Sequence, residues 1–287
     1  MNRKFLVVML FMITSILYSF EEGFIWGLRA NFNGSLTLPS ISQEDLYKLS
    51  AAYMKGAVGY TMDGEAELGY LFGAERWFGK EKSDFSKFSG ISLYVSIGVG
   101  TGFSGMVAGN TLQVGTNSAV SAQMFMNVNY KPVISFGIGS KLYLLESRMA
   151  IGLQLGIKTI VDTSPEYLAY SDMDKTFSDL GVTLPEMSEI VVTDFMKKNM
   201  NPVMFSMKLM LEYNQPINDR VEVVLGIYTR FNIYKPKYIT MPDTLLGLIN
   251  TAKKTQNAAE FNPQTPLNSY YMNSLDFGIS LGLQFRG

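Results

Sequence analysis

The chain has 287 residues and a formal net charge of −1, so it offers no general electrostatic attraction to nucleic acid. It contains neither cysteine nor histidine, which excludes a disulfide framework, Ser/His and Cys/His catalysis, and the usual zinc sites. Charged residues are only 17% of the chain, and no run after residue 20 approaches the length of a helical membrane span. If the chain lies in a membrane, it crosses as strands.

The N-terminal segment has the features of a cleavable secretory signal. Two basic residues precede an apolar stretch over residues 5–18, and Ser19 stands before an acidic pair. The stretch is short beside the roughly 20 residues of a transmembrane helix, although an uncleaved anchor is the alternative. We therefore expect a signal peptide over residues 1–19, export through the general secretory pathway, and a single barrel domain over residues 20–287.

Eight later segments alternate apolar residues with small or polar ones, the pattern of strands whose two faces meet different surroundings. The last is the clearest, because every second residue from Leu275 to Phe285 is apolar and the intervening ones are Asp, Gly, Ser, Gly and Gln. The segments cover residues 24–38, 65–78, 88–103, 133–145, 149–161, 203–214, 221–234 and 271–285.

The connections between these segments alternate in length. Those after the second, fourth and sixth segments are compact, and those after the first, third, fifth and seventh are several times longer. Transmembrane barrels have short periplasmic turns and long external loops in this order. The sequence therefore predicts an all-β fold, a transmembrane antiparallel up-and-down β-barrel of eight strands in the outer membrane, with short helices in the long external loops.

Residues 104–131 leave the strand count open. An alternating piece from Ala122 to Tyr130 is interpreted as a strand extension or hairpin in the second external loop, and a ten-stranded barrel is the alternative. Three external loops carry helix signals: Ser42 caps a run to about Met54, and proline followed by an acidic residue opens runs ending near residues 198 and 254.

In residues 149–161 and 221–233, the charged residues share one face, and the same parity is applied to the other segments. Such a residue facing lipid at mid-depth costs roughly 2–4 kcal/mol for Lys or Arg, so the charged face is expected to line the lumen. A water-soluble barrel would have the opposite polarity. The predicted lumen charges are Arg29, Glu65, Glu67, Glu75, Lys141, Lys158, Lys208, Glu212, Glu222, Arg230 and Asp276.

Aromatic residues fall near the predicted membrane interfaces, where amphipathic rings are favoured. The positions are Trp26, Trp77, Phe78 and Phe285 toward the periplasm, and Tyr234, Tyr238, Tyr270 and Tyr271 toward the outside.

Motifs that carry chemistry are almost absent. Glu65 and Glu67 share a strand face and could form an acid/base pair, but five inward cations favour a structural ion network instead. Gly100, Gly102 and Gly105 spell a nominal dinucleotide motif, but no helical period follows and no acidic residue lies about 20 positions on, so these glycines are expected to make room on a narrow inner wall or to permit strand bending. We predict no catalytic residue, no cofactor, no metal and no enzymatic activity.

On its signal, its eight alternating segments, its loop pattern and the aromatic Phe285 near the C-terminus, the chain resembles the small outer-membrane barrels of the OmpA, OmpX and OmpW type. The resemblance is architectural and implies no specific functional residue. It implies outer-membrane lipid and the barrel-assembly machinery as partners, with Phe285 as the assembly signal, although Arg286 and Gly287 follow it where the family ends on its aromatic residue.

Two functions fit these features. The first is a barrel whose lumen is filled by side chains and which acts as a structural or adhesin-like surface protein, with an extracellular ligand bound through the long loops and no nucleic-acid partner. The second is a narrow channel for passive passage of small or hydrophobic solutes. An eight-stranded barrel is just wide enough for side chains to fill it, which favours the first.

Overall fold

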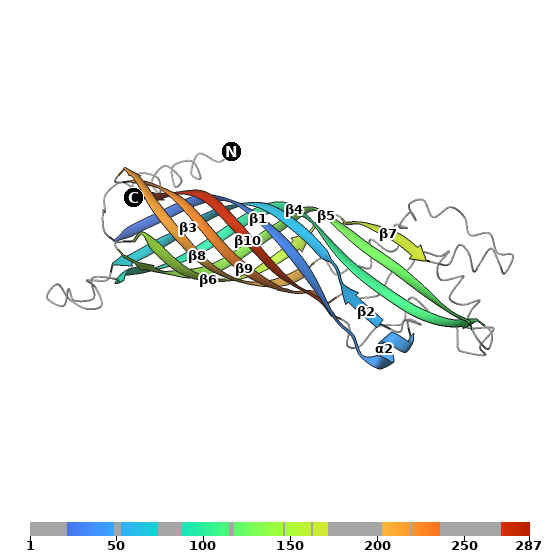
Figure 1. Cartoon of the computed structure of the whole chain (residues 1–287). Coiled ribbons are helices and arrows are strands. Elements are labelled where there is room, and N and C mark those ends of the chain that lie inside the picture. Colours follow the sequence, from blue (N-terminus) through green and yellow to red (C-terminus); the bar gives the residue numbers. More distant parts are fainter. Residues whose placement is uncertain are drawn as a thin grey trace, which may run out of the picture.

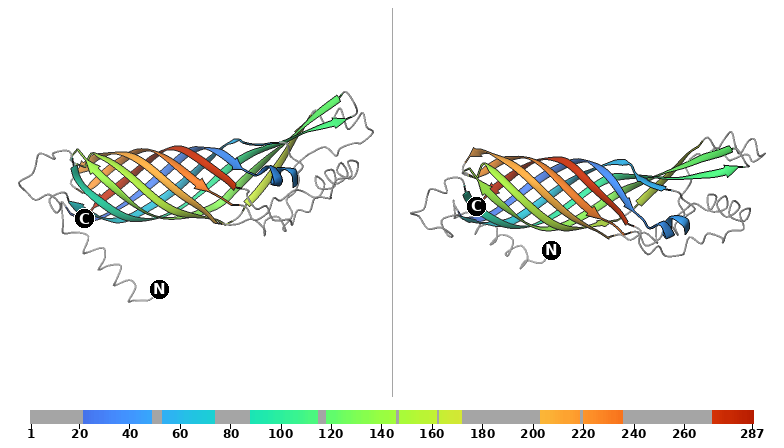
Figure 2. Two further views of the ribbon diagram at one scale, coloured as in Figure 1. Left: turned by 90° about the horizontal axis from the view of Figure 1, so that it is seen from below. Right: turned by 60° about the horizontal axis from the view of Figure 1, so that its bottom comes forward.

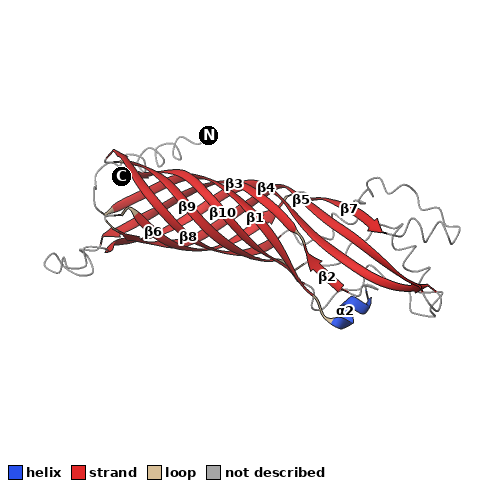
Figure 3. Cartoon of the chain, viewed as in Figure 1, coloured by secondary structure: helices blue, strands red, loops and turns tan. Residues whose placement is uncertain are grey.

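A computed structural model describes residues 22–48, 53–73, 88–114, 118–145, 147–161, 163–171, 203–218, 220–235 and 271–287. Eight long strands form the body of the molecule: β1 (Gly23–Ser40), β3 (Val58–Gly73), β4 (Phe88–Val114), β5 (Ser118–Leu144), β6 (Met149–Ile160), β8 (Val203–Asn218), β9 (Val221–Ile233) and β10 (Tyr271–Arg286). Two shorter strands, β2 (Tyr53–Gly56) and β7 (Thr163–Ser171), and one helix, α2 (Gln43–Lys48), complete the described elements (Figure 3).

The eight long strands close into an antiparallel barrel (Figure 1). Each pairs with the next in the order β1-β3-β4-β5-β6-β8-β9-β10, and β10 returns to β1. This last pairing runs from Ile25 opposite Arg286 to Ser40 opposite Tyr271. The eight-stranded up-and-down barrel predicted from the sequence is therefore confirmed, and the ten-stranded alternative is not the one adopted.

The strands β4 and β5 continue well beyond the closed ring as a hairpin. Their pairing extends to Val114 opposite Ser118, whereas β3 accompanies β4 only to Phe103. β2 and β7 pair with the outer parts of β4 and β5, so a small sheet projects from one end of the barrel (Figure 2). Residues 104–131 are thus a strand extension and hairpin, as expected. We call this end the mouth, and the opposite end, which carries the β8–β9 turn, the turn end.

The barrel is apolar outside and polar inside. Leu28, Val95 and Ile279 are more than half exposed, and similar Leu, Ile, Val and Phe side chains cover the outer face of the described strands. The inner face carries buried Arg, Lys, Glu, Asp, Asn, Gln and Ser. A barrel in water would have the opposite arrangement, so this is the polarity of a barrel surrounded by lipid.

The second predicted strand was misplaced. It was expected at residues 65–78, but β3 begins at Val58 and ends at Gly73, which shortens the first connection. An Asp63-Gly64 pair is a turn signal by composition. In the barrel, both residues lie within β3, opposite Asn31 and Ala30 of β1. The Asp63 carboxylate faces the lumen and contacts Arg230.

The connection between β1 and β2 contains a helix that is shorter than predicted. The Asp45 amide donates to the Ser42 side chain at 3.1 Å, so Ser42 caps α2 as expected. However, α2 ends at Lys48 and Met54 belongs to β2, so the expectation of a helix to Met54 was wrong. Among the described residues, no helix has the length and hydropathy needed to cross a bilayer.

Part of the expected aromatic girdle is present at the turn end. Trp26 stacks on Phe285 with ring centroids 3.9 Å apart, across the seam between β1 and β10. Phe24 and Tyr70 lie edge to face beside them at 5.3 Å. Tyr234 does not belong to a girdle, because its side chain is fully buried.

Several sequence predictions fall outside the described residues. They are the signal peptide, the helices near residues 185–198 and 244–254, and the side chains of Glu75, Trp77, Phe78, Tyr238 and Tyr270.

Inward glycines give a test of how tightly the interior is filled. A Cβ at Gly139 would lie 2.5 Å from the ring of Tyr94 and 2.7 Å from the Leu153 carbonyl oxygen. Gly139→Ala should therefore lower stability by about 1–3 kcal/mol in unfolding of the purified barrel in detergent. The control is Gly34→Ala on the outer face, where a Cβ meets nothing within 4 Å. Equal stability of the two variants would contradict a packed lumen.

Candidate functional site

The structure places ten of the eleven predicted lumen charges inside the barrel, and the eleventh, Glu75, lies outside the described residues. None of the ten is more than 8% exposed. They are Arg29, Glu65, Glu67, Lys141, Lys158, Lys208, Glu212, Glu222, Arg230 and Asp276. Their charges are of both signs, and they are arranged in layers along the barrel axis.

The layer nearer the turn end is a closed ring of four ion pairs. Arg29 contacts Glu67 and Glu212, each at 2.9 Å, and Lys141 contacts the same two carboxylates at 2.6 and 3.2 Å. These four residues come from β1, β3, β5 and β8, which are spread around the whole barrel. We call this group the ion ring. Each charge has two partners of opposite sign, which is what an ion removed from water requires.

Small residues on the inner wall make room for the ion ring. A Cβ at Gly152 would lie 3.0 Å from the Lys141 Cγ atom, and one at Gly282 would lie 2.9 Å from the Arg29 Cγ atom. Lys141 also lies over the ring of Tyr94 at 4.8 Å. The alternation of glycine with long charged residues on neighbouring strands is therefore what allows side chains to extend across so narrow an interior.

A second layer joins strands on opposite sides of the barrel. Lys208 on β8 donates to Glu65 on β3 at 2.9 Å, and four pairing steps separate these strands in either direction around the ring. Gln154 on β6 and Asn31 on β1 also donate to Glu65, at 2.6 and 3.1 Å. Lys208 lies over the ring of Tyr228 at 4.8 Å. Side chains from three other strands are thus bound to one carboxylate on β3.

The third layer includes a charged residue that the sequence analysis missed. Asp63 on β3 contacts Arg230 on β9 at 3.2 Å and accepts a hydrogen bond from Asn31 at 2.6 Å. It was missed because the predicted strand began at Glu65. The signal was present, since Asp63, Glu65 and Glu67 occupy alternate positions of one continuous strand.

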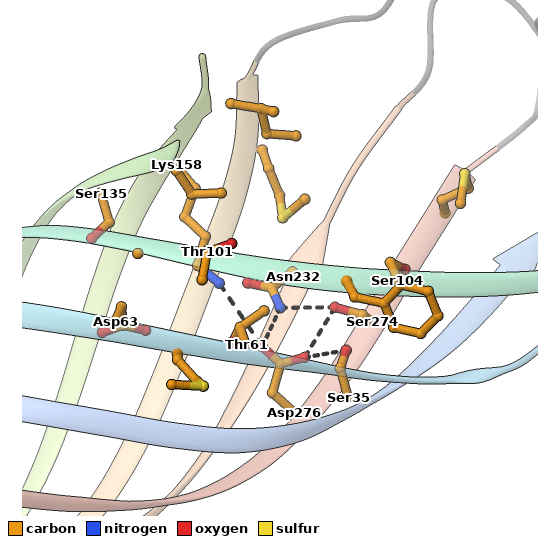
Figure 4. Close-up of a pocket in the computed structure, with 17 residues that line it drawn as sticks. Ser35, Thr61, Asp63, Thr101, Ser104, Ser135, Lys158, Asn232, Ser274 and Asp276 are labelled. Atoms are coloured by element: carbon orange, nitrogen blue, oxygen red, sulfur yellow. Dashed lines mark hydrogen bonds and ion pairs between the residues drawn. The ribbon is translucent and has the colours of Figure 1, made fainter. Parts of the chain in front are cut away.

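The layer at the mouth is centred on Asp276. Its carboxylate accepts hydrogen bonds from Ser35 at 2.7 Å, Asn232 at 2.7 Å and Ser274 at 3.2 Å (Figure 4). Lys158 approaches the same carboxylate only to 3.8 Å. These residues line a cavity of about 50 Å³ at the mouth of the lumen.

The turn end is closed by a mixed polar and apolar layer. Arg286 contacts Glu222 at 2.9 Å, and Gln284 donates to the same carboxylate at 3.1 Å. The fully buried Tyr143 donates to Gln284 at 3.3 Å. Below the ion ring, Tyr143 belongs to an apolar cluster with Ile25, Leu71 and Ala150.

The hypothetical acid/base pair is engaged in these layers. Glu65 contacts Lys208, and Glu67 contacts Arg29 and Lys141, so each carboxylate is held by cations from other strands. Within the described ranges, no three His, Cys, Asp or Glu residues are grouped as metal ligands would be. The absence of enzymatic activity stays a prediction.

Comparison with known proteins gives fold likenesses alone. No family model and no curated protein matches the chain. Among solved structures, Neisserial surface protein A shares 7% identity at a TM-score of 0.29, with 91% of this chain and 97% of that one covered. OprG of Pseudomonas aeruginosa shares 9% at 0.30, covering 93% and 98%. The Escherichia coli outer membrane protease OmpT shares 8% at 0.34, covering 95% and 100%. Values this low transfer neither an activity nor a ligand.

The ion ring predicts a charge-dependent stability. Lys141→Met leaves two buried carboxylates with one cation between them, so unfolding in detergent should show a loss of about 3–5 kcal/mol. Adding Glu212→Gln restores neutrality in the ring and should recover part of that loss. The matched control is Lys131→Met at an exposed position in the middle of β5, expected to stay within about 0.5 kcal/mol of wild type. A double variant less stable than Lys141→Met would contradict the ring.

Proposed function

We propose that the protein is an outer-membrane barrel with a plugged lumen, which acts as a structural or surface-interaction protein through the parts of the chain that lie beyond the mouth. The observation that carries this proposal is the set of ion pairs that join opposite walls of the barrel. The proposal has three components: the location in a membrane, the blocked lumen and the external surface.

The outer face supports the location. Its exposed Leu, Ile, Val and Phe side chains would make a soluble protein aggregate, and lipid is the solvent that suits them. The aromatic residues Trp26, Phe24, Tyr70 and Phe285 gather at the turn end, at the depth where such rings are favoured in membranes. Long external loops at the mouth would then place that end outside the cell.

The cross-lumen contacts support the blocked lumen. A direct 2.9 Å contact between Lys208 on β8 and Glu65 on β3 leaves no space for a hydrated ion between two opposite strands. The ion ring repeats this closure one layer nearer the turn end. Opening a path would require separating several buried pairs at once, and each separated ion would lose its partners in a poorly solvated interior.

The projecting sheet supports the surface role. β4 and β5 extend beyond the ring and are joined by β2 and β7, so paired backbone stands outside the region that lipid would cover. Such a surface is a suitable place to bind an extracellular ligand, because external segments carried on a rigid barrel are held in position.

A narrow channel is the alternative. The cavity at the mouth gives it some support, because a solute could enter the lumen as far as Asp276 and Lys158. In planar bilayers, we expect the folded wild-type barrel to show no steady conductance. Its folded state can be verified by its anomalous migration on gels before boiling. If the barrel shows steady ion conductance, and Arg230→Ala changes its ion selectivity, the protein is a channel and the proposal of a plugged lumen is wrong.

The topology has its own test. A short epitope inserted between Val114 and Ser118, at the tip of the β4–β5 hairpin, should be reached by antibody on intact cells. The same epitope inserted after Asn218, in the β8–β9 turn, should be reached only after the outer membrane is permeabilised. The opposite pattern would mean that the orientation is reversed, and recovery of the protein in the soluble periplasm would overturn the membrane location.

A further inference from the structure

The cavity at the mouth is lined by side chains from all eight strands of the barrel. Its volume of about 50 Å³ corresponds to only a few water-sized positions, since one such position takes about 10–15 Å³ on this measure. A ligand that fits has about four or five non-hydrogen atoms. The cavity lies above the blocked layers, so a ligand could reach it from outside without crossing the barrel.

Of the charged residues that line this cavity, Lys158 has the longest ion-pair contact. Lys158 is only 7% exposed, yet its ammonium has a single ion-pair contact among the described residues, to Asp276 at 3.8 Å (Figure 4). An ammonium carries three donors. By comparison, Lys141 has carboxylate oxygens at 2.6 and 3.2 Å, and Lys208 has one at 2.9 Å. A buried cation held this loosely needs a further acceptor.

The acidic residues of the cavity do not have the same need. Asp276 accepts hydrogen bonds from Ser35, Asn232 and Ser274, and Asp63 is paired with Arg230 and Asn31. A bound metal cation would have to displace these donors and would face two buried cations. The chemistry therefore favours a ligand that brings a negative charge and accepts hydrogen bonds.

The neighbours of Lys158 indicate the shape of that ligand. Ser135 lies beside Lys158 on β5, and Met204 lies beside it on β8. Two residues further along β6, Ile160 packs against Val133 and Met204. A cation and a hydroxyl thus lie next to a small apolar wall, which matches a charged head attached to a short alkyl group.

We propose that the mouth of the lumen binds a free short-chain monocarboxylate of about the size of acetate or propionate. The carboxylate accepts hydrogen bonds from Lys158 and Ser135, and the alkyl group lies against Ile160 and Met204. This site is independent of the surface role proposed above, because it requires only the open mouth and not the projecting sheet.

The test uses the purified full-length barrel in detergent, labelled with ¹³C at its methionine methyl groups. Sodium acetate and sodium propionate are titrated against sodium chloride at constant ionic strength. The methyl signals of Met204 and Met272, which line the cavity, should shift with saturation. The signal of Met207, which lies on the outer face and is 48% exposed, should stay unchanged as an internal reference.

Three variants assign the binding to its residues. Lys158→Gln should abolish the saturable shift, whereas Lys131→Gln, an exposed lysine near the same end, should leave it intact. Ser135→Ala keeps the charge and should weaken binding roughly fivefold, the size expected for one hydrogen bond. If Lys158→Gln does not fold, Ser135→Ala and the wild-type methyl shifts still test whether the carboxylate binds in this cavity.

Several outcomes would overturn the proposal. One is a linear, unsaturable shift, or none, in the wild type. Another is an equal response to chloride, which would indicate an unspecific ion effect, or to citrate, which the cavity is too small to hold. A saturable response to calcium that is lost in Asp276→Asn would make the cavity a cation site instead. Unchanged acetate binding by Lys158→Gln or by Ser135→Ala would remove the residues assigned to it.

Discussion

Pairing of buried charges across a narrow interior is the constraint on which the rest of this structure depends. Lipid outside forces ionised side chains inward, and eight strands leave an interior only as wide as the side chains that fill it. Each ion must then find a partner on another wall, as Lys208 does with Glu65 and Arg29 with Glu212. The positions of glycine, tyrosine and the buried amides follow from that requirement.

The interior changes in character from one end to the other. At the turn end, Tyr143 and its apolar neighbours fill the lumen. In the middle of the barrel, every described carboxylate is close to at least one cation or amide side chain. At the mouth, serine and threonine replace the long charges, and Lys158 has only a distant partner. The same strands therefore enclose a densely paired interior over most of their length and a small cavity at the mouth.

Most of the fold could be predicted from local pattern, because a period of two residues and a single charged face are visible in each strand separately. The ion-pair partners in the lumen could not be predicted in this way, since the stagger of the strands around the closed barrel decides which charged side chains meet. Arg29 lies opposite Glu65 in backbone register, yet its side chain reaches Glu67 and Glu212 instead. Asp63 was missed because the predicted strand began two residues later, whereas in the structure Asp63 pairs with Asn31 inside β3.

The pairing between β1 and β10 is the step that closes the barrel during folding. Ile25 pairs with Arg286, and the stacked rings of Trp26 and Phe285 join the first and last strands of the barrel. These contacts have nearly the greatest sequence separation that the chain allows, so their loop closure comes late. Until β10 pairs with them, β1 and β9 are unpaired edge strands in the hydrocarbon region of the membrane. A chain released before β10 is synthesised would retain two unpaired edges and could not become a stable membrane protein.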